Sequence, residues 1–283
     1  MNAWICLTCG TQFTPSNNPP NACPICRDER QYIGRHGQQW TTLARMQVDG
    51  FHNDLHELEP RLTEIHTAPK FAIGERALLL QTDEGNVLWD CVSLMDDNTA
   101  DAVRAHGGIA AIAISHPHYY TTMVEWAERF DARVYLHEAD REWVMRGSER
   151  ITFWSGESHP LMRGVMLARL GGHFPGGTVL HWAAGANGRG ALLTGDIIDV
   201  VADQRWVSFM YSYPNLIPLP VAEVRHIGAA VAGYDFDRIY GAWIDAVVSE
   251  DAKDAVARSV ERYIGAIEQG EIGLSRRRSS KGG

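Results

Sequence analysis

The chain has 283 residues, of which 45% are hydrophobic and 22% are charged. These proportions are those of a globular protein with a substantial core, so they exclude a disordered chain, a coiled coil and a small disulfide-stapled fold. A formal net charge of -9 argues against nucleic acid or an anionic membrane as a general partner. Because no apolar run approaches a membrane span and the first residues lack a signal-peptide pattern, we expect a cytoplasmic protein.

Four of the five cysteines lie in the first 26 residues. They form two Cys-x-x-Cys motifs, Cys6 with Cys9 and Cys23 with Cys26. Two residues between cysteines let a tight turn direct both sulfur atoms to one point, and two such turns form a tetrahedral thiolate site. The segment between the pairs is polar and rich in proline, so a metal would serve as the core of this module. Two disulfides are the alternative, which a cytoplasmic protein disfavours.

The two cysteine pairs resemble the knuckles of rubredoxin-like zinc ribbons. The resemblance covers about 30 residues and implies zinc or iron as the bound metal. We therefore predict a metal ribbon over residues 1–34, a connector over 35–50 and a main domain over 51–270. A disordered tail is predicted over 271–283, where the basic run Arg276 to Arg278 lies.

In the main domain, the elements are predicted from apolar periodicity and turn residues. Strands are predicted at 62–66, 77–81, 87–90, 109–114, 132–136, 165–170, 178–183, 191–194 and 238–240. Helices are predicted at about 98–107, 122–130, 138–146, 221–232 and 251–267. This mixture, without a repeat period, predicts a layered α/β protein with mixed sheets.

Two histidines stand out among the 12 in the chain, because His116 and His118 lie two residues apart directly after a buried strand. In an extended chain this spacing directs both imidazoles to one side, and Pro117 stiffens the backbone between them. His173 lies in a glycine-dense turn, where the backbone can approach a site closely. Asp196 ends the apolar strand at 191–194. These four side chains are therefore candidate metal ligands.

In this order, the motifs resemble those of the metallo-β-lactamase superfamily. That superfamily has His-x-His-x-Asp-His after a buried strand, then a Gly-His-x-Pro-Gly turn, an Asp that ends an apolar strand, and a late Gly-His. Residues 115–118 match the first half of the first motif, 172–176 match the second and 194–196 match the third. Asp90 is similar to an Asp that ends an early strand in the superfamily and supports the metal ligands without binding the metal itself. The resemblance spans about residues 60–245 and implies an αββα sandwich of two mixed sheets, preceded here by the small metal ribbon.

The chain departs from the superfamily where a second metal would bind. Tyr120 and Thr121 stand in place of the Asp and His of the first motif, and residues 240–243 read Tyr-Gly-Ala-Trp in place of the late Gly-His. Tyr119 and Tyr120 are expected to be wall residues, although a phenol can also orient a substrate or donate a hydrogen bond to a metal-bound water. Of the two, Tyr120 is the candidate catalytic residue.

The resemblance consequently implies one metal, zinc or iron, in the main domain. His116, His118 and His173 would bind it, with Asp196 as a fourth ligand or as a base. The first functional interpretation is a mononuclear hydrolase, in which metal-bound hydroxide attacks an ester or thioester of a small molecule.

Two other interpretations stay open. One is a mononuclear iron oxidoreductase of the persulfide-dioxygenase type, with His116, His173 and Asp196 as its triad. The other is an inactive member that keeps a structural metal. Loops at 154–163 and 201–220 carry aromatic residues that line either a substrate pocket or a homodimer interface.

Overall fold

The computed structural model describes residues 1–268, so the tail predicted over 271–283 lies outside the described residues. Within residues 1–268, no helix has both the length and the hydropathy needed to cross a membrane. The elements are, in chain order, β1 (Ile5–Cys6), α1 (Pro24–Arg27), β2 (Trp40–Thr41), α2 (Leu43–Val48), β3 (His52–Glu59), β4 (Leu62–Ala68), β5 (Arg76–Leu80), β6 (Val87–Trp89), α3 (Asp97–Ala105), β7 (Ala111–Ala113), η1 (Pro117–Tyr119), α4 (Met123–Phe130), β8 (Arg133–His137), η2 (Glu138–Trp143), β9 (Ile151–Trp154), β10 (Ser158–Met162), β11 (Val165–Arg169), β12 (Thr178–Trp182), α5 (Gly185–Gly188), β13 (Ala191–Gly195), β14 (Asp199–Val200), β15 (Val207–Ser208), β16 (Met210–Ser212), β17 (Ile217–Pro218), α6 (Val221–Ala232), β18 (Arg238–Gly241), β19 (Val247–Val248) and α7 (Ala252–Glu268).

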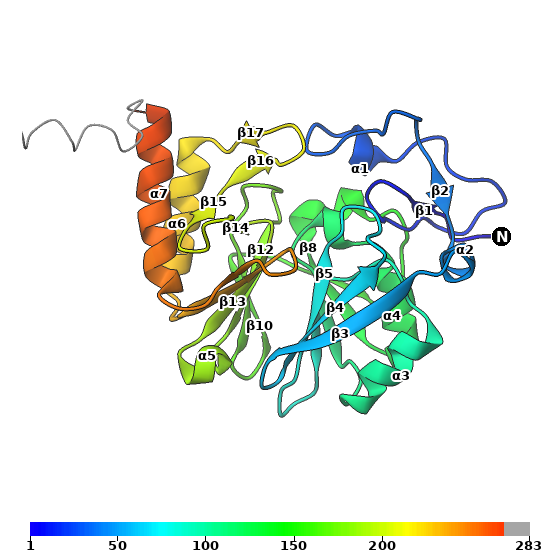
Figure 1. The fold of residues 1–283 in the computed structure, drawn as a ribbon, viewed down its shortest axis with the longest axis horizontal. Helices are drawn as coiled ribbons and strands as arrows, with labels where there is room; N and C mark the ends of the chain where they lie inside the picture. Colours follow the sequence, from blue (N-terminus) through cyan, green and yellow to red (C-terminus); the bar gives the residue numbers. More distant parts are fainter. Residues whose placement is uncertain (269–283) are drawn as a thin grey trace, which may run out of the picture.

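Two large mixed sheets form the main domain (Figure 1). The first has seven strands in the order β3-β4-β5-β6-β7-β8-β9, antiparallel as far as β6 and parallel from β6 to β9. The second has six strands in the order β10-β11-β12-β13-β18-β19, in which β13 and β18 run parallel and the other neighbours antiparallel. The predicted α/β fold with mixed sheets is confirmed.

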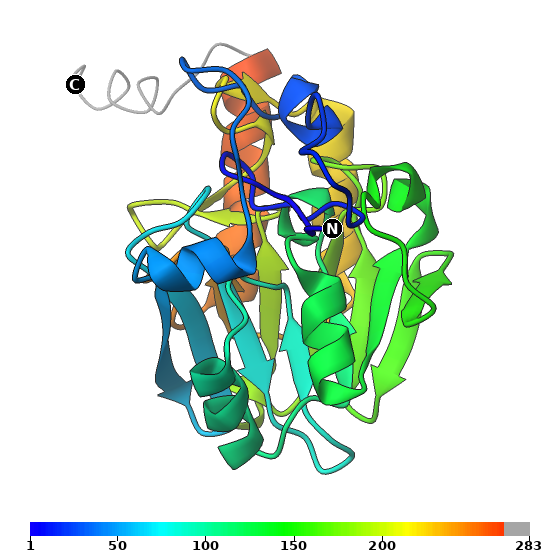
Figure 2. The same ribbon diagram turned by 90° about the vertical axis from the view of Figure 1, so that its right-hand side faces the viewer.

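The sheets pack face to face because alternate side chains of a strand point to opposite sides. In β5, Leu78 and Leu80 pack toward the second sheet, whereas Leu79 packs with α3 and α4 on the outer face. In β13, Leu193 packs toward the first sheet and Leu192 packs with α6 and α7. Figure 2 shows α3 and α4 in front of the first sheet. The layers are therefore helix, sheet, sheet and helix, which is the predicted αββα sandwich.

Several elements were not predicted, and one strand and one helix show the physical reasons. β3 has no continuous apolar run because it is the exposed edge of the seven-stranded sheet. The helix predicted over 138–146 is the shorter 3-10 helix η2, with a non-helical backbone at Asp140. The carboxylate of Asp140 accepts a hydrogen bond from the backbone N of Gly176 at 2.9 Å, and this tertiary contact favours the local turn.

The N-terminal segment, which carries the four cysteines, forms a small module at one end of the sandwich (Figure 2). Its two-stranded sheet pairs β1 with β2, so that Ile5 is opposite Thr41 and Cys6 is opposite Trp40. β2 comes from residues 35–50, the segment predicted to be a connector. The ribbon sheet thus uses residues from both sides of the predicted boundary at residue 34.

Candidate metal centre

The four ribbon cysteines are buried and lie together. Sγ of Cys6 is 3.5 Å from Sγ of Cys26, and Sγ of Cys9 is 3.6 Å from Sγ of Cys23. At these separations the sulfur atoms are not bonded to one another, since a disulfide S–S bond is about 2.0 Å long. They approach the roughly 3.8 Å edge of a sulfur tetrahedron around zinc. Nε2 of Gln38 donates to Sγ of Cys6 at 3.0 Å, a contact that stabilises a thiolate, so the group fits a metal ion.

A second group comes from the loop after β7. His116 has an extended backbone, but residues 117–119 form the 3-10 turn η1 in place of the extended chain predicted for this motif. Pro117 favours this turn because its fixed φ suits the first helical position. The imidazoles of His116 and His118 still reach the same place, with ring centroids 5.0 Å apart.

Asp90 supports this loop from the end of β6. Its Oδ1 accepts a hydrogen bond from the backbone N of Ser115 at 2.7 Å, and Oγ of Ser115 lies 2.9 Å from Nδ1 of His116. Asp90 thus holds His116 through Ser115. Gly195 allows the end of β13 to approach the same loop, since its φ is +52° and a Cβ there would lie 2.5 Å from Oγ of Ser115.

His173 and Asp196 complete the group from the second sheet. Nδ1 of His173 lies 3.2 Å from the carbonyl oxygen of Met210, so this nitrogen donates and Nε2 keeps its lone pair. Nε2 of His173 is 3.2 Å from Nδ1 of His118. Oδ2 of Asp196 is 3.8 Å from Nε2 of His116. The structure therefore brings together all four side chains that the sequence predicts as ligands; we call them the histidine cluster.

The histidine cluster fits a metal ion. One ligand atom from each of the four residues lies within 4.8 Å of the others, and all four residues are buried. Nε2 of His116 and Nε2 of His118 have no hydrogen-bond partner among the described residues. Leaving a buried polar atom unpaired costs about 1–3 kcal/mol, whereas three imidazoles and a carboxylate form a typical set of cation ligands.

Burial determines the protonation of the imidazoles. It lowers the pKa of His116 and His118 well below the usual range, and it lowers the pKa of His173 to about 4. The three rings are therefore neutral near pH 7, in the form that binds a metal. Burial raises the pKa of Asp196 well above the usual range, and the charge of a bound cation would act in the opposite direction.

Tyr119, rather than Tyr120, contacts the histidine cluster. Its hydroxyl donates to Oδ1 of Asp196 at 3.2 Å, and its ring centroid lies 5.1 Å from that of His116. A 3-10 turn places residues three apart on the same side. The side chain of Tyr119 therefore lies beside that of His116. Tyr120 is buried in the core between the first sheet and its helices, and within residues 1–268 its hydroxyl makes no hydrogen bond with the cluster. Of the two tyrosines, Tyr119 is therefore the one that contacts the cluster, and the catalytic role of Tyr120 stays a prediction.

Other side chains stand where the resemblance would require a second set of ligands. Oγ1 of Thr121 donates to the carbonyl of Cys91 at 3.1 Å, and Trp243 lines the cavity described next. The part of the chain that the structure describes has two groups able to hold a metal, the ribbon cysteines and the histidine cluster. The main domain therefore offers one metal group.

A cavity of about 310 Å³ opens beside His118 and Asp196. Its remaining walls come from the ribbon and from loops of the main domain, through Arg30, Gln31, Tyr32, Lys70, Ala72, Ile73, Tyr213, Pro214 and Trp243. The loop at 201–220 thus borders this cavity, as one sequence interpretation predicted. In the other aromatic loop, at 154–163, Trp154 does not line this cavity but packs into the core between the two sheets.

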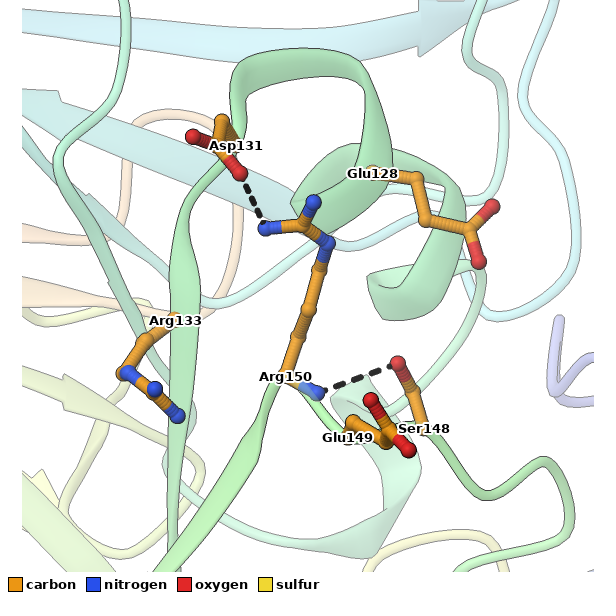
Figure 3. A pocket seen from close by; sticks show the side chains of 6 residues that line it. All are labelled: Glu128, Asp131, Arg133, Ser148, Glu149 and Arg150. Atoms are coloured by element: carbon orange, nitrogen blue, oxygen red, sulfur yellow. Dashed lines mark hydrogen bonds and ion pairs between the residues drawn. The ribbon is translucent and has the colours of Figure 1, made fainter.

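A larger hollow of about 690 Å³ lies between the end of α4 and the residues before β9 (Figure 3). It is lined by Glu128, Asp131, Arg133, Ser148, Glu149 and Arg150. Nη1 of Arg150 pairs with Oδ1 of Asp131 at 2.6 Å. This hollow shares no lining residue with the histidine cluster, so we assign the chemistry to the smaller cavity.

Solved structures share this architecture. The protein VMB-1 at pH 5.5 has a TM-score of 0.59 and 12% identity, over 76% of this chain and 98% of that one. The metallo-β-lactamase FIM-1 from Pseudomonas aeruginosa in its mono-zinc form has a TM-score of 0.55 and 12% identity, over 75% and 96%. A metallo-β-lactamase from Erythrobacter litoralis has a TM-score of 0.53 and 15% identity, over 74% and 95%. Identities this low show a common fold.

One curated relative is similar over nearly the whole chain. The uncharacterized protein YmaE of Bacillus subtilis (strain 168) is 54% identical over 268 residues, which cover 94% of this chain and 97% of YmaE. No known protein-family profile matches the chain. The chain therefore belongs to the same family as YmaE, and it has the metallo-β-lactamase fold preceded by a four-cysteine ribbon.

Proposed function

We propose that the protein is a hydrolase that uses one metal ion, held by the histidine cluster, to cleave an ester or thioester of a small molecule. The observation that carries this proposal is the buried group of three histidines and Asp196 beside a cavity. Zinc bound by such ligands supplies a Lewis acid and lowers the pKa of a bound water toward about 7. We favour zinc because three of the four candidate ligands are neutral imidazoles, a donor set typical of catalytic zinc sites.

The surrounding residues orient the four ligands. The carbonyl of Met210 holds Nδ1 of His173, so that Nε2 faces the cluster. The hydroxyl of Tyr119 holds Oδ1 of Asp196, and the hydroxyl of Tyr213 donates to the backbone carbonyl of Asp196 at 2.6 Å. Contacts of this kind fix ring orientation and ligand basicity. Oδ2 of Asp196 is then free to bind the metal or to accept a proton from the attacking water.

The cavity supports a small substrate. Its volume of about 310 Å³ is at the lower end of the range of about 300–1,000 Å³ for small-molecule sites. Ile73 and Trp243 give it an apolar wall. With a single metal, no second cation is available to stabilise a poor leaving group, so activated esters and thioesters suit the site better than amides or phosphodiesters.

A substrate panel with defined metal content tests the proposal. The zinc-loaded and iron-loaded proteins are assayed against esters, thioesters, lactones and phosphoesters, with His118→Ala as the variant that lacks one ligand. We expect the zinc form to hydrolyse activated esters and thioesters, and we expect His118→Ala to abolish this activity.

Two other results would each replace the proposal. Oxygen consumption by the iron form with a persulfide substrate, without hydrolysis by the zinc form, would favour the oxidoreductase. Inertness of both forms would favour an inactive protein that keeps a structural metal.

A further inference from the structure

Arg30 lies four residues after the last ribbon cysteine, and Asp28 holds its side chain. Oδ1 of Asp28 accepts from the backbone N of Arg30 at 3.0 Å and from its Nε at 2.5 Å, while Oδ2 accepts from Nη2 at 2.9 Å. Asp28 is itself fixed by the knuckle, since its backbone N donates to the carbonyl of Pro24 at 3.1 Å. Arg30 is only 8% exposed. The knuckle that carries Cys23 and Cys26 therefore sets the direction of a buried guanidinium.

This guanidinium contacts the turn that carries His173. Nη1 of Arg30 donates to the backbone carbonyl of His173 at 3.3 Å, and the guanidinium carbon lies 3.9 Å from the centre of the Phe174 ring. The Phe174 ring in turn lies 5.0 Å from the ring of His118 and 5.5 Å from that of His116, centre to centre. Arg30 thus touches both the backbone and the aromatic wall of the histidine cluster.

The neighbours of Arg30 contact the loop between β16 and β17, which lies beside the ribbon in Figure 1. Nδ2 of Asn215 donates to the carbonyl of Glu29 at 2.7 Å and to that of Gln31 at 3.1 Å. In the same loop, Tyr213 donates to the backbone carbonyl of Asp196. The ribbon segment around Arg30 is therefore connected to the carriers of two candidate ligands, His173 and Asp196.

We propose that the ribbon is a working part of the active site and that Arg30 is its positioning residue. A metal bound by the cysteines folds the knuckle, the knuckle orients Arg30, and Arg30 holds the His173 turn in the geometry that binds the second metal. The positive charge of Arg30 alone would oppose a nearby cation, but Asp28 compensates it within the same segment. This inference rests on the proposed function, because it requires that the histidine cluster binds a metal.

A physical consequence is that the two metal sites are coupled. Small thiolate modules fold when they bind their metal, so an empty ribbon would release Arg30. Coupling between binding sites is reciprocal, so filling either site raises the affinity of the other. The same ribbon segment also forms a wall of the substrate cavity through Arg30 and Gln31, which places substrate between the ribbon and the main domain.

Cobalt(II) titration of the metal-free full-length protein tests this inference, because cobalt reports the two sites separately. Thiolate-to-cobalt charge-transfer absorption reports the ribbon, and the d–d bands in excess of those of thiolate-bound cobalt report the histidine cluster. In Arg30→Gln we expect the ribbon to fill and the cluster to bind cobalt about tenfold more weakly, with altered d–d bands. Backbone amides of residues 171–177 are expected to exchange with solvent faster than in the parent protein.

Arg27→Gln is the matched control, because Arg27 is an exposed arginine of the same knuckle. We expect it to leave cobalt binding at the cluster unchanged. Arg30→Lys is a milder second variant that keeps the charge but lacks the planar fork and the stacking surface, so we expect a smaller loss in the same direction.

The outcomes separate this inference from the proposed function. If the parent protein and both Arg30 variants bind cobalt equally well at the cluster, the positioning role is wrong and the proposed function stands. If the cluster of the parent protein binds no metal, both are wrong.

Discussion

The hydroxyl of Tyr119 donates a hydrogen bond to Oδ1 of Asp196 at 3.2 Å, between the turn η1 of one sheet and the end of β13 in the other. Burial raises the pKa of Tyr119 well above its usual range, so the phenol stays protonated and donates. The contact leaves Oδ2 of Asp196 facing Nε2 of His116. It therefore orients the carboxylate toward the metal position.

Tyr119→Phe removes this contact and leaves a buried carboxylate oxygen with one partner fewer. A hydrogen bond to a charged group contributes about 1.5–3 kcal/mol, so we expect metal affinity at the histidine cluster to fall by about tenfold or more. Competition titration with a zinc chelator measures this. Tyr120→Phe makes the same change in the adjacent residue and is expected to leave the affinity unchanged; equal losses in the two variants would refute the assignment to Tyr119.

His116→Ala is expected to lower the metal content by one equivalent per chain. The fold should persist, because the core clusters of the sandwich do not include the histidine cluster. Element-resolved mass spectrometry of the purified protein, together with circular dichroism, checks both points. His36→Ala changes an exposed histidine and should leave the metal content unchanged. Loss of two equivalents in His116→Ala while the ribbon keeps its metal would contradict a single-metal centre.

The double variant Cys6→Ser, Cys9→Ser should lose the ribbon metal. We expect the loss of one equivalent of metal from the ribbon, weaker metal binding at the histidine cluster, and faster amide exchange in the first 34 residues, because thiolate modules of this kind depend on their metal for folding. The main unfolding transition should remain, since the sandwich has its own core. Cys91→Ala alters the one cysteine outside the ribbon and should keep both metals. Disulfide-bonded ribbon cysteines in the metal-free native protein would overturn the metal assignment.

Arg76→Met should destabilise the main domain strongly. Nη1 of Arg76 pairs with Oε2 of Glu64 at 2.7 Å, and both side chains are buried. The same guanidinium donates to the backbone carbonyls of Gly241 and Ala246. These hydrogen bonds fix both ends of the loop that carries Trp243. Leaving one partner of a buried ion pair unpaired costs about 3–5 kcal/mol, measurable by urea denaturation.

Arg61→Met is the matched control for this prediction. Arg61 pairs with Asp83 at 2.9 Å on the surface, where ion pairs contribute about 0–1 kcal/mol. We expect a change in unfolding free energy within this range. Similar losses in the two variants would show that the Arg76 pair is not specially stabilising.

Local patterns were sufficient for much of the fold and for the choice of ligands. Strands buried on both faces appear as continuous apolar runs, so β5, β7 and β13 are visible in the sequence. The cysteine spacing predicts a thiolate site because two short turns converge on one point. The edge strand β3 was missed, since a strand that is largely exposed has no apolar pattern to read.

Tertiary structure alone decided which tyrosine faces the metal position and what covers the cluster. Tyr119 and Tyr120 are adjacent and chemically equal in sequence, and only the turn η1 determines which hydroxyl reaches Asp196. Arg30 and His173 are 143 residues apart, and the local sequence around either residue does not indicate that the two are in contact. Their contact depends on how the ribbon, the glycine turn and the loop between β16 and β17 fit together in three dimensions, because periodicity and spacing record only interactions between near neighbours in the chain.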